Sequence, residues 1–222
     1  MRFKRLRYAF AETAVLAGIL SVQLYAVEPQ DVRPHESRTV QLERWMPNDP
    51  VRVVRVMFGD VAVQPGVPFV AEGDWLQKVS IVIRNETQKK ITAAVIHVDF
   101  PDTESAGHPR MGHQFTLGQR PEHAMYNRLG KRVSDLPREP FELLPGQEVA
   151  VSLGGQYEKI KGFIESRQPM QTVKTCWVRL LGFFFEDGTR WDVSHYARPD
   201  PDHPGRYIPI TVQDFRGGST SE

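Results

Sequence analysis

The chain has 222 residues, a formal net charge of +1, 40% hydrophobic residues and 25% charged residues. This balance is typical of a globular protein, and the near-neutral charge excludes an extended basic surface of the kind that binds nucleic acid or anionic membranes. Cys176 is the only cysteine, which excludes an internal disulfide. Its place in a strand-like pattern predicts a small, buried residue.

Residues 1–26 have the pattern of a secretory signal peptide. Four basic residues precede an apolar run from Thr13 to Leu24, and Ala26 is the small residue at its end. We expect cleavage before Val27, which changes the formal net charge to −2 and places the protein in the periplasm or outside the cell. The alternative is an uncleaved anchor, although the run is shorter than the ~20 residues of a membrane span. Membrane contact is expected only through this segment.

Residues 27–50 read as an extended linker, because four prolines lie among charged residues. Residues 40–45 are its one candidate strand. The folded domain is expected at residues 51–212, and residues 213–222 are expected to be disordered.

Seven segments of the domain have the β-branched and alternating pattern of strands. The clearest are Leu76–Arg84 and Ile91–Phe100, which predict two antiparallel strands around a polar hinge at residues 85–90. The other five segments are residues 51–63, 111–117, 148–153, 173–186 and 189–193.

The C-terminal half adds one helix and one hairpin to this pattern. Tyr157, Ile160 and Ile164 have helical spacing, and Pro169 ends the segment. Asp187-Gly188 predicts a type I′ turn between a long central strand and its partner. Residues 195–209 read as a proline-rich tail.

Strands separated by turns, with no βαβ alternation, predict an all-β protein. The expected fold is an antiparallel immunoglobulin-like β-sandwich with one short helix, preceded by a signal peptide. Within it, residues 101–140 contain five prolines and form a long loop around an edge strand at residues 111–117. Long loops are often functional.

A set of turn and strand residues also resembles a known family. Residues Asn85, Thr87, Ile91, Val98, Phe100, Pro101, Asp102, Leu144, Pro145, Gly146 and Gln147 occur in the order found in bacterial exported immunoglobulin-like modules of the FxLYD type. The resemblance covers residues 75–153. The chain departs from the family in its long loop and in the helix. It implies an extracytoplasmic accessory or interaction domain and supplies no catalytic residue.

Histidines and arginines near the long loop are the candidate ligand-binding residues. His97 and Asp99 share one face of a strand, where they form either a polar solvent face or two ligands of a metal that lacks a third. His108, Arg110 and His113 follow in the loop. They are either exposed loop residues or, with His97, part of a pH-sensitive ligand site.

Aromatic residues in the strands offer a sugar-binding face as an alternative to a core. Trp177 shares an alternation with Leu181, Phe183 and Phe185, which predicts that it is buried with them. The other aromatic residues considered are Trp75, Trp191, Tyr196 and Tyr207.

The sequence contains no Gly-x-Ser-x-Gly, phosphate-binding glycine loop or Cys-x-x-Cys. We therefore expect a non-enzymatic exported protein, without a cofactor, that binds a protein or cell-envelope component. The alternative is a sugar-binding, metal-binding or hydrolytic protein whose site is the loop at residues 101–140.

Overall fold

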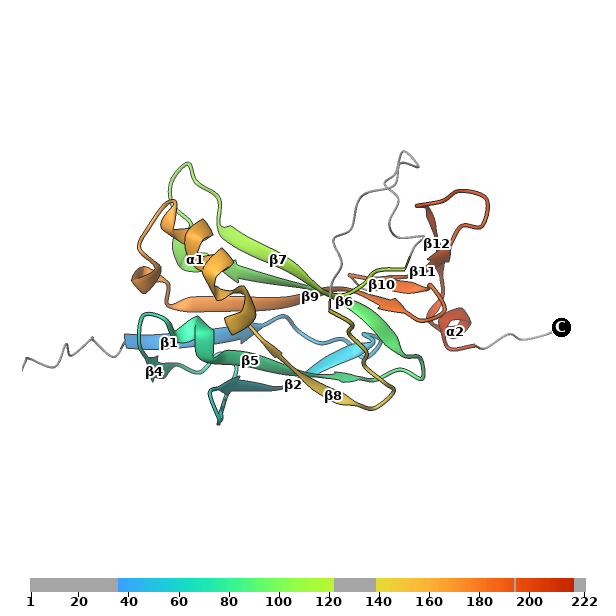
Figure 1. The fold of residues 1–222 in the computed structure, drawn as a ribbon, viewed down its shortest axis with the longest axis horizontal. Helices are drawn as coiled ribbons and strands as arrows, with labels where there is room; N and C mark the ends of the chain where they lie inside the picture. Colours follow the sequence, from blue (N-terminus) through green and yellow to red (C-terminus); the bar gives the residue numbers. More distant parts are fainter. Residues whose placement is uncertain (1–35, 122–138, 194, 218–222) are drawn as a thin grey trace, which may run out of the picture. The chain divides into compact units, whose positions relative to one another are not determined.

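Two β-sheets form the framework of the structure, a computed structural model that describes residues 36–121, 139–193 and 195–217 (Figure 1). The larger, eight-stranded sheet contains β1 (Glu36–Leu42), β4 (Phe69–Ala71), β6 (Ile91–Phe100), β7 (Met111–Gly118), β9 (Thr175–Phe185), β10 (Arg190–Asp192), β11 (His195–Pro199) and β12 (Tyr207–Ile210). The four-stranded sheet contains β2 (Val51–Phe58), β3 (Val61–Val63), β5 (Val79–Asn85) and β8 (Glu148–Ser152), in the order β3-β2-β5-β8.

Buried side chains of both sheets form one hydrophobic core. Ile81 and Ile83 of β5 belong to the same cluster as Ile96 and Val98 of β6, and all four are fully buried. This clustering follows from strand alternation, because every second residue of a half-buried strand faces inward. The predicted mostly-β protein with two sheets and a short helix is confirmed.

The two central strands lie in different sheets. β5 pairs with β2 and β8, whereas β6 pairs with β7 and β9. The polar residues 86–90 between them therefore cross from one sheet to the other, and the two strands predicted around the polar hinge do not pair with each other. β-branched residues favour a strand but do not select its partner.

Residues 36–42 belong to the sheet and not to a linker. β1 pairs in parallel with β9, matching Thr39 with Thr175, and its Val40 is 1% exposed.

The C-terminal limit of the folded domain also differs from the prediction. β11 and β12 pair as antiparallel strands, and α2 (Val212–Phe215) buries Phe215 against Phe185 and Tyr196. The predicted signal peptide at residues 1–26 lies outside the described residues.

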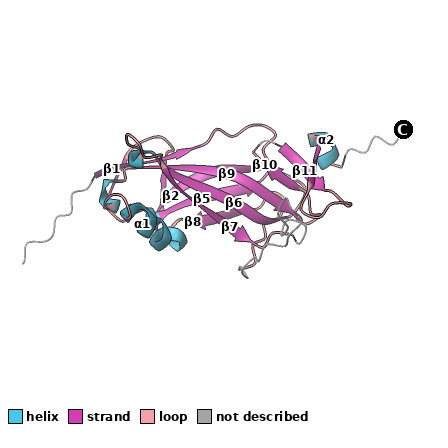
Figure 2. Ribbon diagram, turned by 90° about the horizontal axis from the view of Figure 1, so that it is seen from above, coloured by secondary structure: helices cyan, strands magenta, loops and turns pink. Residues whose placement is uncertain are grey.

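Several predicted elements are confirmed. α1 (Tyr157–Glu165) buries Tyr157, Ile160 and Ile164, and β7 is an edge strand that pairs only with β6 among the described residues. Figure 2 places α1 and α2 at opposite ends of the strands.

The hairpin between β9 and β10 is confirmed, but its turn is not of type I′. Gly188 has a φ of +81°, whereas Asp187 is not among the positive-φ residues. The Gly188 amide donates to Phe185 O at 3.0 Å and the Phe185 amide donates to Thr189 O at 2.9 Å. This is the pattern of a type I turn followed by a left-handed glycine.

A β-bulge in β9 reverses the predicted orientation of Trp177. Val95 pairs with Gly182 and Ile96 pairs with Leu180, so Leu181 is an extra residue. An extra residue exchanges the two faces of a strand beyond it. Phe183 and Phe185 therefore face the core, whereas Trp177 lies on the outer face, and the prediction that Trp177 is a core residue is wrong.

Cys176 precedes Trp177 and faces the core, where it is fully buried. Burial raises the pKa of its thiol well above the ordinary value, since the thiolate is disfavoured away from water. We expect the folded chain to resist alkylation by iodoacetamide at pH 8 and the chain in guanidinium to react fully, as measured by mass spectrometry. Equal labelling rates in the two states would contradict this placement.

Candidate functional site

The outer face of the eight-stranded sheet carries a cluster of polar and aromatic side chains. We name it the Trp177 face and define it by residues His97, Asp99, Arg110, Gly112, Trp177 and Arg179. Its residues come from β6, β7 and β9 and from the segment before β7. Strand pairing brings them together, because Asp99 lies opposite both Gly112 and Trp177.

A chain of polar contacts crosses this face. His97 Nε2 lies 2.9 Å from Asp99 Oδ1, and Arg179 Nη1 lies 3.6 Å from Asp99 Oδ2. The His97 and Asp99 side chains are 22% and 12% exposed, and Arg179 is 37% exposed. One carboxylate thus orients an imidazole and a guanidinium toward the same region of the sheet.

Two arginines lie close to the indole of Trp177. The guanidinium carbons of Arg110 and Arg179 lie 5.6 and 5.7 Å from the ring centroid, within the range of cation–π attraction. Arg110 Nε also lies 3.5 Å from Glu104 Oε2. Among the described residues, His97 Nδ1 and Trp177 Nε1 have no hydrogen-bond partner. Their hydrogen-bonding capacity remains unused.

Gly112 provides the space that the His97–Asp99 pair occupies. A Cβ atom at this position would lie 2.6 Å from His97 Nε2 and 2.8 Å from Asp99 Oδ1. Any larger residue must therefore displace the pair. The glycine gave no recognisable signal in the sequence, because nothing there shows which strand lies beside it.

Replacement of Gly112 by alanine is expected to lower the free energy of unfolding by about 1–3 kcal/mol, the usual cost of overpacking. Gly162→Ala is the matched control, because the same methyl group there meets nothing within 4 Å and stands in a helix. The control is expected to be neutral or stabilising by up to ~1 kcal/mol. Urea unfolding of both variants measures the difference, and equal effects would show that the contact is unimportant.

The four predicted ligand-binding residues do not form one site. His97 and Arg110 belong to the Trp177 face, but His113 lies opposite Val98 on the inner face of the sheet and contacts Gln156. His108 is exposed in the turn before β7. Alternation of side chains along β7 separates His113 from His97, and residues 122–138 of the long loop lie outside the described residues.

The described residues give little support for the alternative of a metal-binding or sugar-binding site. In the described segments, no three His, Cys, Asp or Glu side chains come together as metal ligands. Of the aromatic residues considered for a sugar-binding face, Trp75, Trp191 and Tyr196 are each at most 5% exposed, whereas Trp177 and Tyr207 are partly exposed. Sequence reasoning missed Trp177 and Arg179 because the bulge at Leu181 is not visible in the alternation.

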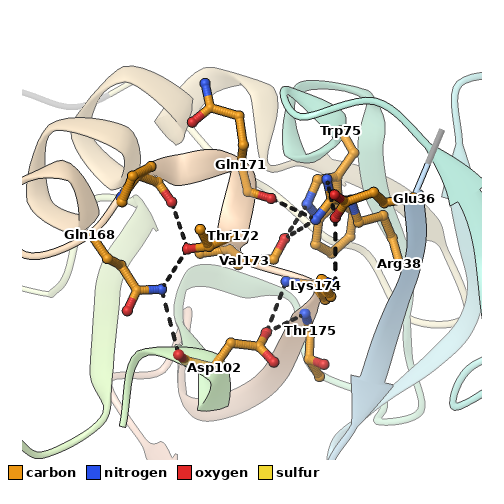
Figure 3. Close-up of polar contacts among 11 residues, drawn as sticks. Glu36, Arg38, Trp75, Asp102, Gln168, Gln171, Thr172, Val173, Lys174 and Thr175 are labelled. Carbon is orange, nitrogen blue, oxygen red and sulfur yellow. Dashed lines mark hydrogen bonds and ion pairs between the residues drawn. The ribbon is translucent and has the colours of Figure 1, made fainter. Parts of the chain in front are cut away.

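A second polar cluster surrounds the buried Arg38 (Figure 3). Its Nη1 atom donates to Val173 O at 2.7 Å and to Gln171 O at 3.0 Å, and its side chain is 1% exposed. Trp75 Nε1 donates to the same Val173 carbonyl at 3.1 Å. These bonds satisfy main-chain carbonyls of the segment between α1 and β9, so this cluster holds the fold together.

Comparison of the chain with protein-family models, characterised proteins and solved structures gives no match. Within the described part of the chain, no helix has the length and apolar character needed to cross a membrane. Functional inference therefore rests on the residues themselves.

Proposed function

We propose that this protein is an exported, non-enzymatic immunoglobulin-like β-sandwich that binds a protein or cell-envelope component through the Trp177 face. The observation that carries the proposal is that Trp177, on the outer face of the larger sheet, lies within cation–π distance of both Arg110 and Arg179. Tryptophan and arginine are the residue types that most often dominate binding energy at protein interfaces.

The charge of this face favours a partner with acidic groups. Arg110 and Arg179 present guanidinium groups that pair with carboxylate or phosphate. Their carboxylate partners within the chain, Glu104 and Asp99, lie at 3.5 and 3.6 Å, farther than the 2.7–2.9 Å of a charge-assisted hydrogen bond, so both guanidinium groups keep the capacity to bind a closer acidic group. An acidic segment of a protein or a phosphate-bearing envelope component fits this arrangement. In the described part of the chain β7 pairs only with β6, and contact at its other edge by strand addition would extend the same surface.

Two sequence features support export and the fold. The basic start and apolar run of residues 1–26 favour a cleaved signal peptide, which would place the protein in the periplasm or outside the cell. The resemblance to FxLYD-type modules supports an accessory role, and the absence of the catalytic sequence motifs sought in the chain favours a binding protein over a hydrolase.

Capture from a cell-envelope extract on the immobilised full chain tests this proposal. We expect a specific partner whose affinity falls about 30-fold in Trp177→Ala, the effect of losing a 2 kcal/mol hot spot. Higher salt should weaken capture in the wild type. Arg55→Ala is the control, because Arg55 is an exposed arginine of the other sheet.

Capture of the same partner by the wild type, the control and Trp177→Ala alike would overturn the assignment of the Trp177 face. Failure to capture any component under several salt conditions would overturn the binding function itself. Thermal unfolding of each variant shows whether a loss of capture reflects a loss of folding.

A further inference from the structure

The outer edge of β7 is unpaired in the part of the chain that the structure describes. β7 pairs with β6 along its whole length, from Met111 opposite Phe100 to Gly118 opposite Ala93. In an antiparallel strand, about half of the main-chain N–H and C=O groups point away from such a partner. No main-chain hydrogen bond joins residues 112–118 to any other described segment. The outward groups of β7 can therefore pair with a further strand.

β7 also lacks the features that protect the edges of most sheets, which are charged residues, proline, bulges and short length. It contains no Lys, Arg, Asp, Glu or Pro, and its register with β6 is continuous. The other edge strands of the described sheets are shorter. β3 and β4 have three residues each, β12 has four and includes Pro209, and β8 has five, whereas β7 has eight. β7 is therefore the edge best suited to strand pairing.

The helix α1 lies beside the start of β7 (Figure 1). Gln156, which precedes α1, has its Oε1 atom 3.5 Å from His113 Nε2, and Arg167, which follows α1, donates from Nη1 to Pro109 O at 2.9 Å. Phe163 lies about two turns after Gln156 and about one turn before Arg167, so it stands on the same side of the helix. Its side chain is 44% exposed. α1 thus presents an exposed aromatic ring on the side where it contacts β7.

The side chains around this edge indicate the chemistry of a strand that would pair with it. Such a strand would place alternate side chains on the two faces of the sheet. On the inner face they would continue the row formed by Phe115 and Leu117, beside Phe163. Arg110 and Arg167 stand at the start of β7, and no carboxylate of the described chain pairs with Arg167. These arginines favour an acidic side chain in the incoming strand.

We propose that the edge of β7 binds an extended segment of a partner protein, which adds as a strand, packs an apolar side chain on Phe163 and places an acidic side chain near Arg110 and Arg167. The inference rests on the function proposed above, because it names the part of the partner that binds. Main-chain hydrogen bonds to β7 supply affinity, and the side-chain contacts supply selectivity. An envelope component without a peptide main chain cannot make these bonds, so the inference selects a protein as the partner.

A peptide selected on the full chain from a phage library of random dodecapeptides is the probe. We expect hydrogen exchange, measured by NMR, to slow at alternate amides of residues 112–118 when the peptide binds, because only the outward N–H groups gain a partner. N-methylation of successive peptide amides should weaken binding by at least about 5-fold at every second position of the paired stretch, the value of one lost hydrogen bond.

Phe163→Ala should weaken the peptide about 10-fold, because the variant removes an apolar contact. Arg167→Ala should reduce the salt dependence of binding. Val61→Ala is the control, because Val61 is an exposed apolar residue of the smaller sheet, and the affinity should remain unchanged. The proposal is overturned if no peptide is selected, if all amides of residues 112–118 are already protected in the free chain, or if N-methylation has no two-residue period.

The capture experiment separates a failure of this inference from a failure of the proposed function. A captured partner that depends on Trp177 but protects no β7 amide would overturn strand addition and leave the proposed function standing. A selected peptide that protects alternate β7 amides, together with an extract that yields no partner, would support strand addition at this edge and overturn the envelope-binding function. Thermal unfolding of each variant shows whether a lost affinity reflects lost folding.

Discussion

Replacement of Arg38 by alanine is expected to lower the free energy of unfolding by about 3–5 kcal/mol, the largest single-residue effect that we predict for a polar side chain. The variant would remove both bonds from the buried guanidinium, so that Gln171 O loses this donor and Val173 O keeps only the bond from Trp75 Nε1 (Figure 3). Each hydrogen bond from a charged donor contributes about 1.5–3 kcal/mol. Thermal unfolding should show a decrease in Tm of roughly 10 °C for a domain of this size.

Arg38→Lys and Arg55→Ala separate the contributions of charge, guanidinium geometry and burial to the loss of stability in Arg38→Ala. Lysine keeps the positive charge near Glu36, which lies 3.4 Å from Arg38 Nη2, but its single ammonium group does not reproduce the fork of the guanidinium. We expect an intermediate loss. Arg55 also pairs with a carboxylate, that of Glu148, but its side chain is 55% exposed, so its removal should cost less than about 1 kcal/mol. Equal losses in Arg38→Ala and Arg55→Ala would contradict the role of burial.

The buried arginine also shows why the N-terminal limit of the domain was predicted wrongly. Residues 36–42 stand near prolines and charged residues, and Arg38 reads as a solvent-exposed cation in a linker. Only the packed structure shows that carbonyls of the distant segment at residues 171–173 receive its donors. Burial of a charge depends on such partners, and a single sequence does not show contacts between residues more than 130 positions apart.

Local elements were predicted well because their signals are local. The spacing of Tyr157, Ile160 and Ile164 sets the buried face of α1, and the glycine after Asp187 sets the reversal between β9 and β10. Strand partners and strand faces depend on longer-range information. One extra residue at Leu181 moved Trp177 from the predicted core to the outer face, and with it the centre of the candidate site.

Replacement of Asn85 by alanine is the second large effect that we predict, with a loss of about 2–4 kcal/mol in the free energy of unfolding. The side chain is fully buried, and its Nδ2 atom donates to Lys89 O at 2.8 Å and to Leu143 O at 2.9 Å. Its Oδ1 atom accepts from the Thr87 amide at 2.9 Å and from the Thr87 hydroxyl at 2.8 Å. Alanine removes all four bonds, and each contributes about 1 kcal/mol. Leu143 O keeps its bond from the Ile91 amide and Lys89 O keeps that from the Thr87 hydroxyl, which limits the loss.

Asn85→Asp tests whether the two donors or the two accepted bonds matter more. The carboxyl keeps the acceptor for Thr87 but faces the carbonyls of Lys89 and Leu143, so burial and these oxygens should raise its pKa above the ordinary value. Because the pKa is raised in the folded state, Asn85→Asp should lower the free energy of unfolding only slightly at low pH, where the carboxyl is protonated and donates one bond. The penalty should grow as the pH rises above the pKa of the unfolded chain. Urea unfolding of wild type and Asn85→Asp between pH 4 and pH 8 measures the loss of stability at each pH. A loss that stays constant with pH would place the carboxyl in solvent. It would then contradict the contacts of Asn85 with Lys89, Leu143 and Thr87.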